Sequence, residues 1–319
     1  MLDGSERALL FSSGMAAIST ILMAHIKAGD EVVCSAAVYG GTLHLLTGLL
    51  ARFGVDTRFA SLEALATPER VVGDRTRILW FESPANPTLR CVDIRRIAEA
   101  CRARGVLSVI DNTFASPINQ RPLALGVDLA MQSATKYLNG HSDVLGGVVA
   151  GPMVLLEPIE KTRRMLGGVM DPLPAYALGR GLKTLPLRIA RHNASAQTVA
   201  AWLARDSRVS QVFYPGLESH PDHAIAKRQM TGFGGLVCFD LDGDASRAER
   251  VYDRLQVVRR AASLGGIESL ISPPALTSQW GHTDDQLRDA GITKGMLRLS
   301  VGLEDVEDIV EDLDQALAR

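Results

Sequence analysis

The chain of 319 residues has few cysteines, and their spacing suits neither disulfide nor metal chemistry. The four are Cys34, Cys91, Cys101 and Cys238, with no CxxC pair and no other metal-ligand spacing among them. Buried free thiols in a reducing compartment are the simplest interpretation. The sequence therefore predicts no disulfide scaffold and no metal site.

Neither sign of charge is in excess, and no apolar run is long. Lysine and arginine total 34 against 36 aspartates and glutamates, which gives no basic surplus for nucleic acid or an anionic membrane. No stretch approaches the 18 or so consecutive apolar residues of a membrane span, and no basic segment leads into the apolar run of a signal peptide. We expect a cytoplasmic protein that acts on a small molecule.

Familiar nucleotide and metalloprotease motifs are also missing. The chain contains no GxxxxGK[ST], no GxGxxG after a strand and no HExxH. Gly146, Gly147 and Gly151 flank an apolar strand, where they serve backbone packing. His141 and Asp143 are close in sequence and are predicted to make loop hydrogen bonds rather than to bind metal.

Short β-branched runs alternate with helical patterns through the first half. Residues 31–34, 77–81 and 106–110 read as strands, and residues 94–104 show the apolar spacing of a helix. This order predicts an α/β fold with a mostly parallel central sheet flanked by helices. Ligands of such sheets bind beyond the carboxyl ends of the strands, which is where Asp111 would lie.

The second half predicts a smaller α+β domain. A helical region from about 171 to 204, interrupted at Pro186, is expected to cross between domains. A strand over 235–239, a helix after Asp244 and a final amphipathic helix follow. We place a large domain at 1–180 and a C-terminal domain, including the linking helix, at 181–319.

Two segments of the first half could bind the two polar ends of one cofactor, a phosphate and a protonated ring nitrogen. Ser12, Ser13 and Gly14 precede a helix predicted over 16–27, where they either bind a phosphate at its N-terminus or only cap it. Asp111 ends a buried strand, where an acid is costly unless it is paired. Its partner is either a protonated pyridine nitrogen or a neighbouring loop.

Lys136 lies in the most specific segment, 131–137. It follows an apolar strand predicted over 127–131 and should emerge near the carboxyl edge of the sheet. A lysine there can form an imine with an aldehyde and, once displaced, act as a base. Ser133 and Thr135 add hydroxyl groups suited to phosphate oxygens. An exposed surface lysine is the alternative, but the three segments together favour a cofactor site.

These segments belong to an ordered series of motifs that resembles the Cys/Met-metabolism pyridoxal-phosphate (PLP) enzymes over essentially the whole chain. That family includes cystathionine γ-synthase, cystathionine γ-lyase and β-lyase, methionine γ-lyase and the homoserine sulfhydrylases. The resemblance implies the fold-type I transferase fold. The motifs are SGMAA at 13–17, VYGGT at 38–42, ESPANPT at 82–88, IDNTF at 110–114, SATKY at 133–137, SLGGIES at 263–269 and LRLSVG at 297–302.

For the phosphate and ring of PLP, the resemblance implies a contact set. Backbone N–H groups of Gly14 and Met15 bind the phosphate, together with Ser133 and Thr135. The residues implied at the ring are Tyr39, which stacks on it and acts as an acid or base, Asn86 at the 3′ oxygen, Asp111 at the pyridine nitrogen and Lys136 as the Schiff-base lysine.

On the substrate side, the resemblance implies that Arg298 binds the α-carboxylate with its bidentate fork, beside Ser263. The implied activity is γ-elimination or γ-replacement at cystathionine, homocysteine, methionine or an O-acylhomoserine. An O-acylhomoserine sulfhydrylase or a cystathionine β-lyase is the alternative on this scaffold. A homodimer or homotetramer is implied as well.

The sequence departs from the family pattern at several places. Family members carry several dozen residues before the SGMAA motif, including a Tyr-x-Arg pair that reaches a neighbouring subunit's phosphate, whereas 12 residues precede it here. We therefore expect weaker cofactor binding, and a non-enzymatic subunit is the alternative from another class. Methionine γ-lyases resemble one another in a cysteine where this chain has Gly41.

Two further departures concern the substrate pocket. Cystathionine γ-lyases often have a glutamate at the position of Ala262. Trp280 and His282, in a segment that also departs from the family, either alter the pocket or form a packed loop.

Overall fold

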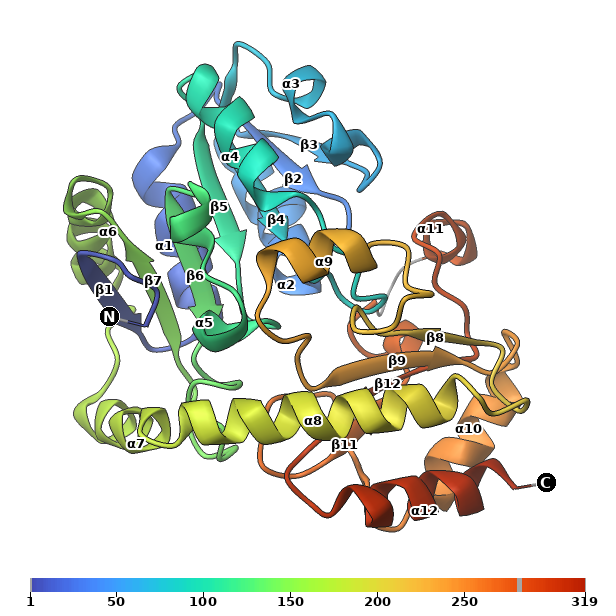
Figure 1. The fold of residues 1–319 in the computed structure, drawn as a ribbon. Helices are drawn as coiled ribbons and strands as arrows, with labels where there is room; N and C mark the ends of the chain where they lie inside the picture. The colour runs from blue at the N-terminus through green and yellow to red at the C-terminus, as the bar shows by residue number, and fades with distance from the viewer. Residues whose placement is uncertain (1, 280–282, 319) are drawn as a thin grey trace.

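The computed structural model describes residues 2–279 and 283–318. Its first part is a seven-stranded sheet whose neighbours from β6 to β3 run parallel, while β7 runs antiparallel to its two neighbours, β6 and β1 (Figure 1). The strands, in sheet order, are β1 (Arg7–Phe11), β7 (Gly147–Gly151), β6 (Leu129–Ser133), β5 (Leu107–Asp111), β4 (Thr76–Glu82), β2 (Glu31–Ser35) and β3 (Asp56–Ala60).

Both faces of this sheet are covered, which explains why its central strands are apolar throughout. Along β4, Ile78 and Trp80 pack into the cluster that contains α1 (Gly14–His25) and α6 (Met153–Leu166). Leu79 and Phe81 point to the opposite face, where α4 (Ile94–Ala103) packs. The predicted α/β architecture is confirmed.

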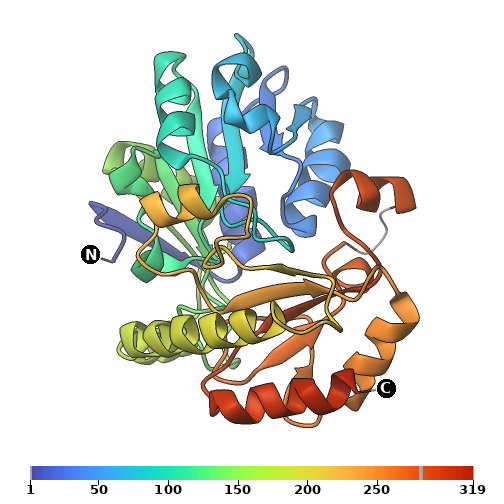
Figure 2. The ribbon, with the colours of Figure 1, turned by 45° about the vertical axis from the view of Figure 1, so that its right-hand side comes forward.

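The second part contains a smaller five-stranded sheet (Figure 2). Its order is β10 (Arg259–Arg260), β11 (Leu270–Ser272), β12 (Met296–Ser300), β9 (Leu236–Asp240) and β8 (Gln211–Phe213), antiparallel except for β10 with β11. The long helix α8 (Leu185–Leu203) and α12 (Val306–Leu317) share a core with this sheet. The predicted boundary at 180 falls inside α7 (Pro172–Leu182) and stays a prediction.

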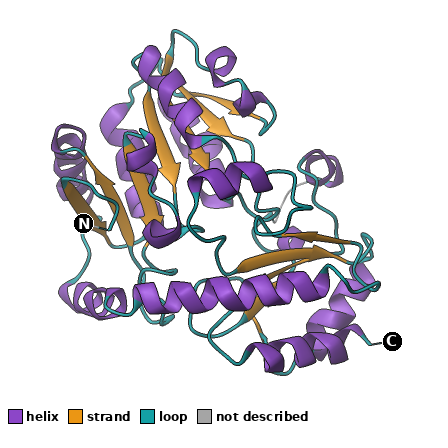
Figure 3. Ribbon diagram, viewed as in Figure 1, coloured by secondary structure: helices purple, strands orange, loops and turns teal. Residues whose placement is uncertain are grey.

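The remaining elements are short, as Figure 3 shows. They are α2 (Gly40–His44), a π-helical turn (Leu45–Leu49), α3 (Pro68–Val71), α5 (Ser116–Asn119), α9 (His223–Gln229), α10 (Ala245–Arg254), α11 (Asp284–Asp289) and 3₁₀ turns at Leu50–Phe53, Ala64–Ala66, Pro122–Leu125 and Pro274–Leu276. Among the described residues, no helix has the length and apolar character needed to span a membrane.

Three predicted boundaries were wrong. The helix predicted from 16 begins at Gly14, because Ser13 caps it by accepting a hydrogen bond from the N–H of Ala16. The strand predicted over 127–131 is Leu129–Ser133. The helical region breaks at 183–184 rather than at Pro186, which lies in the first turn of α8, where proline is well tolerated.

Arg188 of α8 joins the linking helix to the segment that follows Lys136. The side chain is only 4% exposed and donates to the carbonyls of Tyr137 (2.7 Å), Leu138 (3.4 Å) and Gly181 (2.8 Å), as well as to the hydroxyl of Thr184 (3.0 Å). The described part of the chain gives this guanidinium no carboxylate partner. Oxygens of the Lys136 loop and of residues 181 and 184 therefore solvate the buried charge.

Replacing Arg188 with Met should lower the free energy of unfolding by about 3 kcal/mol, because buried carbonyls lose their donors. Arg191→Met is the matched control, since Arg191 is exposed on the same helix and donates to the carbonyl of Glu304. That control should cost about 0.5 kcal/mol or less. Urea denaturation followed by circular dichroism measures both, and equal losses would contradict the expectation.

Candidate functional site

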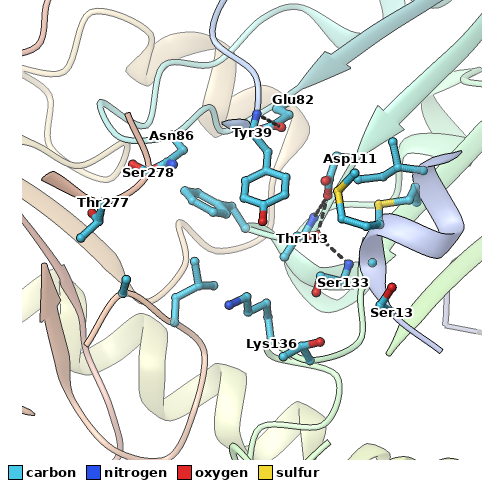
Figure 4. A pocket seen from close by; sticks show the side chains of 18 of the residues that line it. Ser13, Tyr39, Glu82, Asn86, Asp111, Thr113, Ser133, Lys136, Thr277 and Ser278 are labelled. Carbon is cyan, nitrogen blue, oxygen red and sulfur yellow. Dashed lines mark hydrogen bonds between the residues drawn. The ribbon is translucent and has the colours of Figure 1, made fainter. Parts of the chain in front are cut away.

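A cavity of about 500 Å³ lies at the carboxyl edge of the seven-stranded sheet and extends to the second part of the chain. Three parallel strands end there, each on a polar residue: β4 on Glu82, β5 on Asp111 and β6 on Ser133. Figure 4 shows these side chains around the cavity, with the Tyr39 ring pointing into it. The strand order thus collects polar groups from distant parts of the sequence.

The structure brings the predicted site residues together. All but one line this cavity, and the exception, Ser263, contacts it through Lys136. The lining residues are Gly14, Met15, Tyr39, Asn86, Asp111, Ser133, Thr135, Lys136 and Arg298.

Lys136 is held by a neutral partner. Its Nζ donates to Ser263 Oγ at 2.9 Å, across 127 positions of sequence. Burial, together with the positive charge of Arg298, lowers the pKa of Lys136 from its usual 10.5 to about 8. A substantial fraction of this amine is therefore neutral, and thus nucleophilic, near physiological pH.

Asp111 has one oxygen engaged by the protein. The N–H of Thr113 donates to Oδ1 at 3.0 Å, and the Thr113 hydroxyl donates to the same atom. Burial raises the pKa of Asp111 to about 6, although the Thr113 bonds oppose that rise. A protonated ring nitrogen in the cavity would be a fitting partner, because an adjacent cation stabilises the carboxylate.

The N-terminus of α1 provides room for an anion. A Cβ on Gly14 would lie 3.3 Å from Ser133 Oγ, so the glycine leaves space that a side chain would fill. The Thr135 hydroxyl also lines the cavity and bonds the Gly146 backbone, accepting from its N–H at 3.1 Å. Helix N–H groups and hydroxyls are the donors that a phosphate requires, so this end fits the phosphate of PLP.

Arg298 lies on β12 and reaches the cavity from the second part. It is 4% exposed and donates from one terminal nitrogen to Asn86 Oδ1 at 2.9 Å. Its buried Nε has no hydrogen-bond partner, and no carboxylate of the described residues pairs with it. A buried cation with unused donors suits a carboxylate ligand.

Sequence reasoning missed several groups of the site. Glu82 belongs to the ESPANPT motif, which indicates no role for it by itself, although the residue is 4% exposed and lines the cavity. Thr113 orients Asp111 and accepts from the N–H of Ser133 at 2.8 Å. The Phe114 ring has its centre 6.0 Å from the Arg298 guanidinium. Their positions at strand ends were the available signal.

Two other predictions have different outcomes. His141 contacts the carbonyl of Asn139 at 2.7 Å, and Asp143 accepts from the side-chain amide of Asn139 at 2.8 Å, which confirms loop hydrogen bonds. Trp280 and His282 lie outside the described residues.

Known relatives match almost all of this chain. The chain is 42% identical to cystathionine γ-synthase 1, chloroplastic, of Arabidopsis thaliana, over 99% of this chain but 56% of that protein. It is also 42% identical to L-methionine γ-lyase of Pseudomonas putida, over 99% of this chain and 80% of that one. The crystal structure of cystathionine γ-lyase from Lactobacillus plantarum superposes with a TM-score of 0.95 at 38% identity, covering 99% of this chain and 82% of that one.

A family model agrees with these likenesses. The model of the Cys/Met metabolism PLP-dependent enzymes matches residues 1–318. The chain therefore belongs to the Cys/Met metabolism PLP-dependent enzyme family, whose cofactor is pyridoxal 5′-phosphate.

Proposed function

We propose that this chain is a transsulfuration enzyme that catalyses γ-elimination or γ-replacement at a sulfur amino acid. Cystathionine, homocysteine, methionine and the O-acylhomoserines form the substrate class. The observation that carries the proposal is the Lys136 amine, held by Ser263 in a cavity that also contains Asp111 and Arg298. Those groups supply an aldehyde-reactive amine, a partner for a ring nitrogen and a cation for a substrate carboxylate.

The cofactor would lie between these groups. Gly14, Met15, Ser133 and Thr135 would hold its phosphate, and Asp111 would face its ring nitrogen. When bound, PLP supplies an electron sink for the negative charge that develops at the substrate Cα. Asp111 contributes by keeping that nitrogen protonated, and burial of its carboxylate makes the interaction strong.

Proton transfers fall to two side chains. Lys136 would take the Cα proton, and its pKa of about 8 suits a base that works near neutral pH. Tyr39, which points toward Lys136 in Figure 4, would protonate a departing thiolate. Arg298 would bind the α-carboxylate through terminal N–H groups that presently contact Asn86 and Ser272.

Gly41 supports a γ-synthase or cystathionine γ-lyase over a methionine γ-lyase. A Cβ at this position would lie 2.5 Å from Cε1 of the Tyr39 ring and 2.7 Å from Met15 Sδ. A cysteine at this position, as in methionine γ-lyases, would thus require the Tyr39 ring to move. The present ring position depends on the glycine.

Product analysis with a panel of substrates and added PLP tests the proposed reaction. We expect 2-oxobutanoate from γ-elimination, or a new thioether when a thiol and an O-acylhomoserine are both supplied. Pyruvate as the sole 2-oxo acid product would contradict the proposal and indicate a β-lyase. Formation of a thiol product from sulfide and an O-acylhomoserine would indicate a sulfhydrylase.

Self-association into a homodimer or homotetramer belongs to the same proposal. Exposed large apolar side chains are frequent between residues 165 and 187, including Met165, Leu173, Tyr176 and Leu187, which are each at least 67% exposed. Where such side chains adjoin on a surface they mark a protein interface, so this segment is our candidate for the contact between subunits.

Borohydride reduction after incubation with PLP should attach the cofactor to the peptide that contains Lys136. Lys136→Ala should lose the adduct and lower kcat by about a thousandfold or more, because the reactive amine and the base are both removed. Lys183→Ala is the control, since Lys183 is exposed and lies outside the cavity. Mapping the adduct to another lysine would contradict the assignment.

Covalent uptake of PLP by the cofactor-free chain should rise with pH through about 8, because only the neutral Lys136 amine reacts. Arg298→Met removes a neighbouring positive charge that disfavours the ammonium form. The pKa of Lys136 should therefore rise, and the midpoint should move to higher pH. Arg298→Lys keeps the charge and should leave the midpoint closer to that of the parent chain. Stopped-flow absorbance measures the rate of PLP uptake against pH. An unchanged midpoint in Arg298→Met would contradict the expected effect of Arg298 on the pKa of Lys136.

A further inference from the structure

The backbone of Tyr39 is hydrogen-bonded to the end of strand β4, which borders the cavity. It caps the short helix α2, and its carbonyl accepts from the N–H groups of Thr42 (2.9 Å) and Leu43 (3.1 Å). Its own N–H donates to Oε1 of Glu82 at 2.6 Å, a contact that spans 43 positions of sequence (Figure 4). Glu82 therefore connects the end of the central strand β4 to the segment that carries the Tyr39 ring.

Side-chain packing restrains the ring only in part. The Tyr39 side chain is 47% exposed, so packing alone does not fix it. Gly41 has no side chain to pack against the ring, and a Cβ at that position would collide with it. The position of the ring therefore depends on how the Tyr39 backbone is held, and the bond to Glu82 ties that backbone to the central sheet.

The surroundings of Glu82 favour its uncharged form. It is 4% exposed and pairs in register with Asp111 on the next strand. No cation among the described residues forms an ion pair with it. Burial, followed by the charge of Asp111, raises the pKa of Glu82 well above its usual range, although the hydrogen bond from the Tyr39 N–H opposes that rise. A neutral carboxyl keeps a carbonyl oxygen that accepts from the Tyr39 N–H.

We propose that Glu82 is a positioning residue that, as an uncharged hydrogen-bond acceptor, holds the Tyr39 backbone so that the ring lies over the cofactor position. This inference rests on the proposed function for the role of Tyr39. The proposed role requires a hydrogen-bond acceptor at residue 82 but no negative charge. Two substitutions, Glu82→Gln and Glu82→Met, separate these properties. Gln keeps a carbonyl oxygen in the place of Glu82 Oε1, whereas Met has nearly the same length and no strong acceptor.

Amide hydrogen exchange of the cofactor-free chain tests the contact without any activity. In Glu82→Met, the Tyr39 amide should exchange about tenfold faster than in the parent chain, because the N–H loses its partner. In Glu82→Gln, exchange should stay within about twofold of the parent. Equal exchange in the two variants overturns the proposal. If Glu82→Met does not fold, Glu82→Ala takes its place.

A double-mutant cycle with Tyr39→Ala tests whether Glu82 acts through the ring. Glu82→Met should lower kcat/KM about tenfold in the parent chain, but less than about twofold when Tyr39 is already Ala. Glu82→Gln should keep most of the kcat/KM of the parent chain. Additive losses, or a Gln variant as impaired as the Met variant, overturn the proposal. If the parent chain acts on no sulfur amino acid, the proposed function fails, and hydrogen exchange alone then decides whether Glu82 holds Tyr39.

Discussion

The site depends on the register of three parallel strands that end at one edge of the sheet. Glu82 of β4 pairs with Asp111 of β5, and Asp111 pairs with Met131 of β6. Because side chains alternate between faces, a shift of one residue in β5 would exchange the direction of Asp111 with that of Ile110. The apolar residues that precede each strand end are buried in the helix-covered faces, and their burial holds this register. The chemistry of the edge is thus fixed by the core of the sheet.

Lys136, Arg298 and Asp111 are held in the cavity by neutral partners rather than by one another. Ser263 accepts from Lys136, Asn86 accepts from Arg298, and Thr113 donates to Asp111. Burial of such groups without opposite charges costs stability, since desolvation is only partly offset by neutral hydrogen bonds. The arrangement leaves those charges available to a ligand, and burial shifts the pKa values of Lys136 and Asp111 toward neutrality. A cofactor with an anionic phosphate and a basic ring nitrogen complements this pattern.

Both parts of the chain contribute to the site. The acids end strands of the seven-stranded sheet and Lys136 follows its strand β6, whereas Ser263 and Arg298 come from the part that carries the five-stranded sheet. Arg188 secures the junction, because a helix of the second part donates to the backbone just after Lys136. Gly140 follows in that segment with a positive φ of 71°, and an added Cβ would collide with the Arg188 guanidinium. Docking of the two parts therefore sets the surroundings of the reactive amine.

The sequence by itself determined the alternating α/β order, the Lys136, Asp111 and Gly14 segments and the family, because apolar periodicity and local motifs are carried by neighbouring residues. It placed Asp111 correctly at a strand end. It misplaced the start of α1, which Ser13 caps two residues earlier, and the break before α8, because a proline is tolerated in the first turn of a helix. Only the tertiary structure decided that Ser263 contacts Lys136 and that Glu82 holds Tyr39. These contacts join residues that are 127 and 43 positions apart in the sequence. They arise from the docking of the two parts and from the order of the strands, which no local sequence pattern specifies.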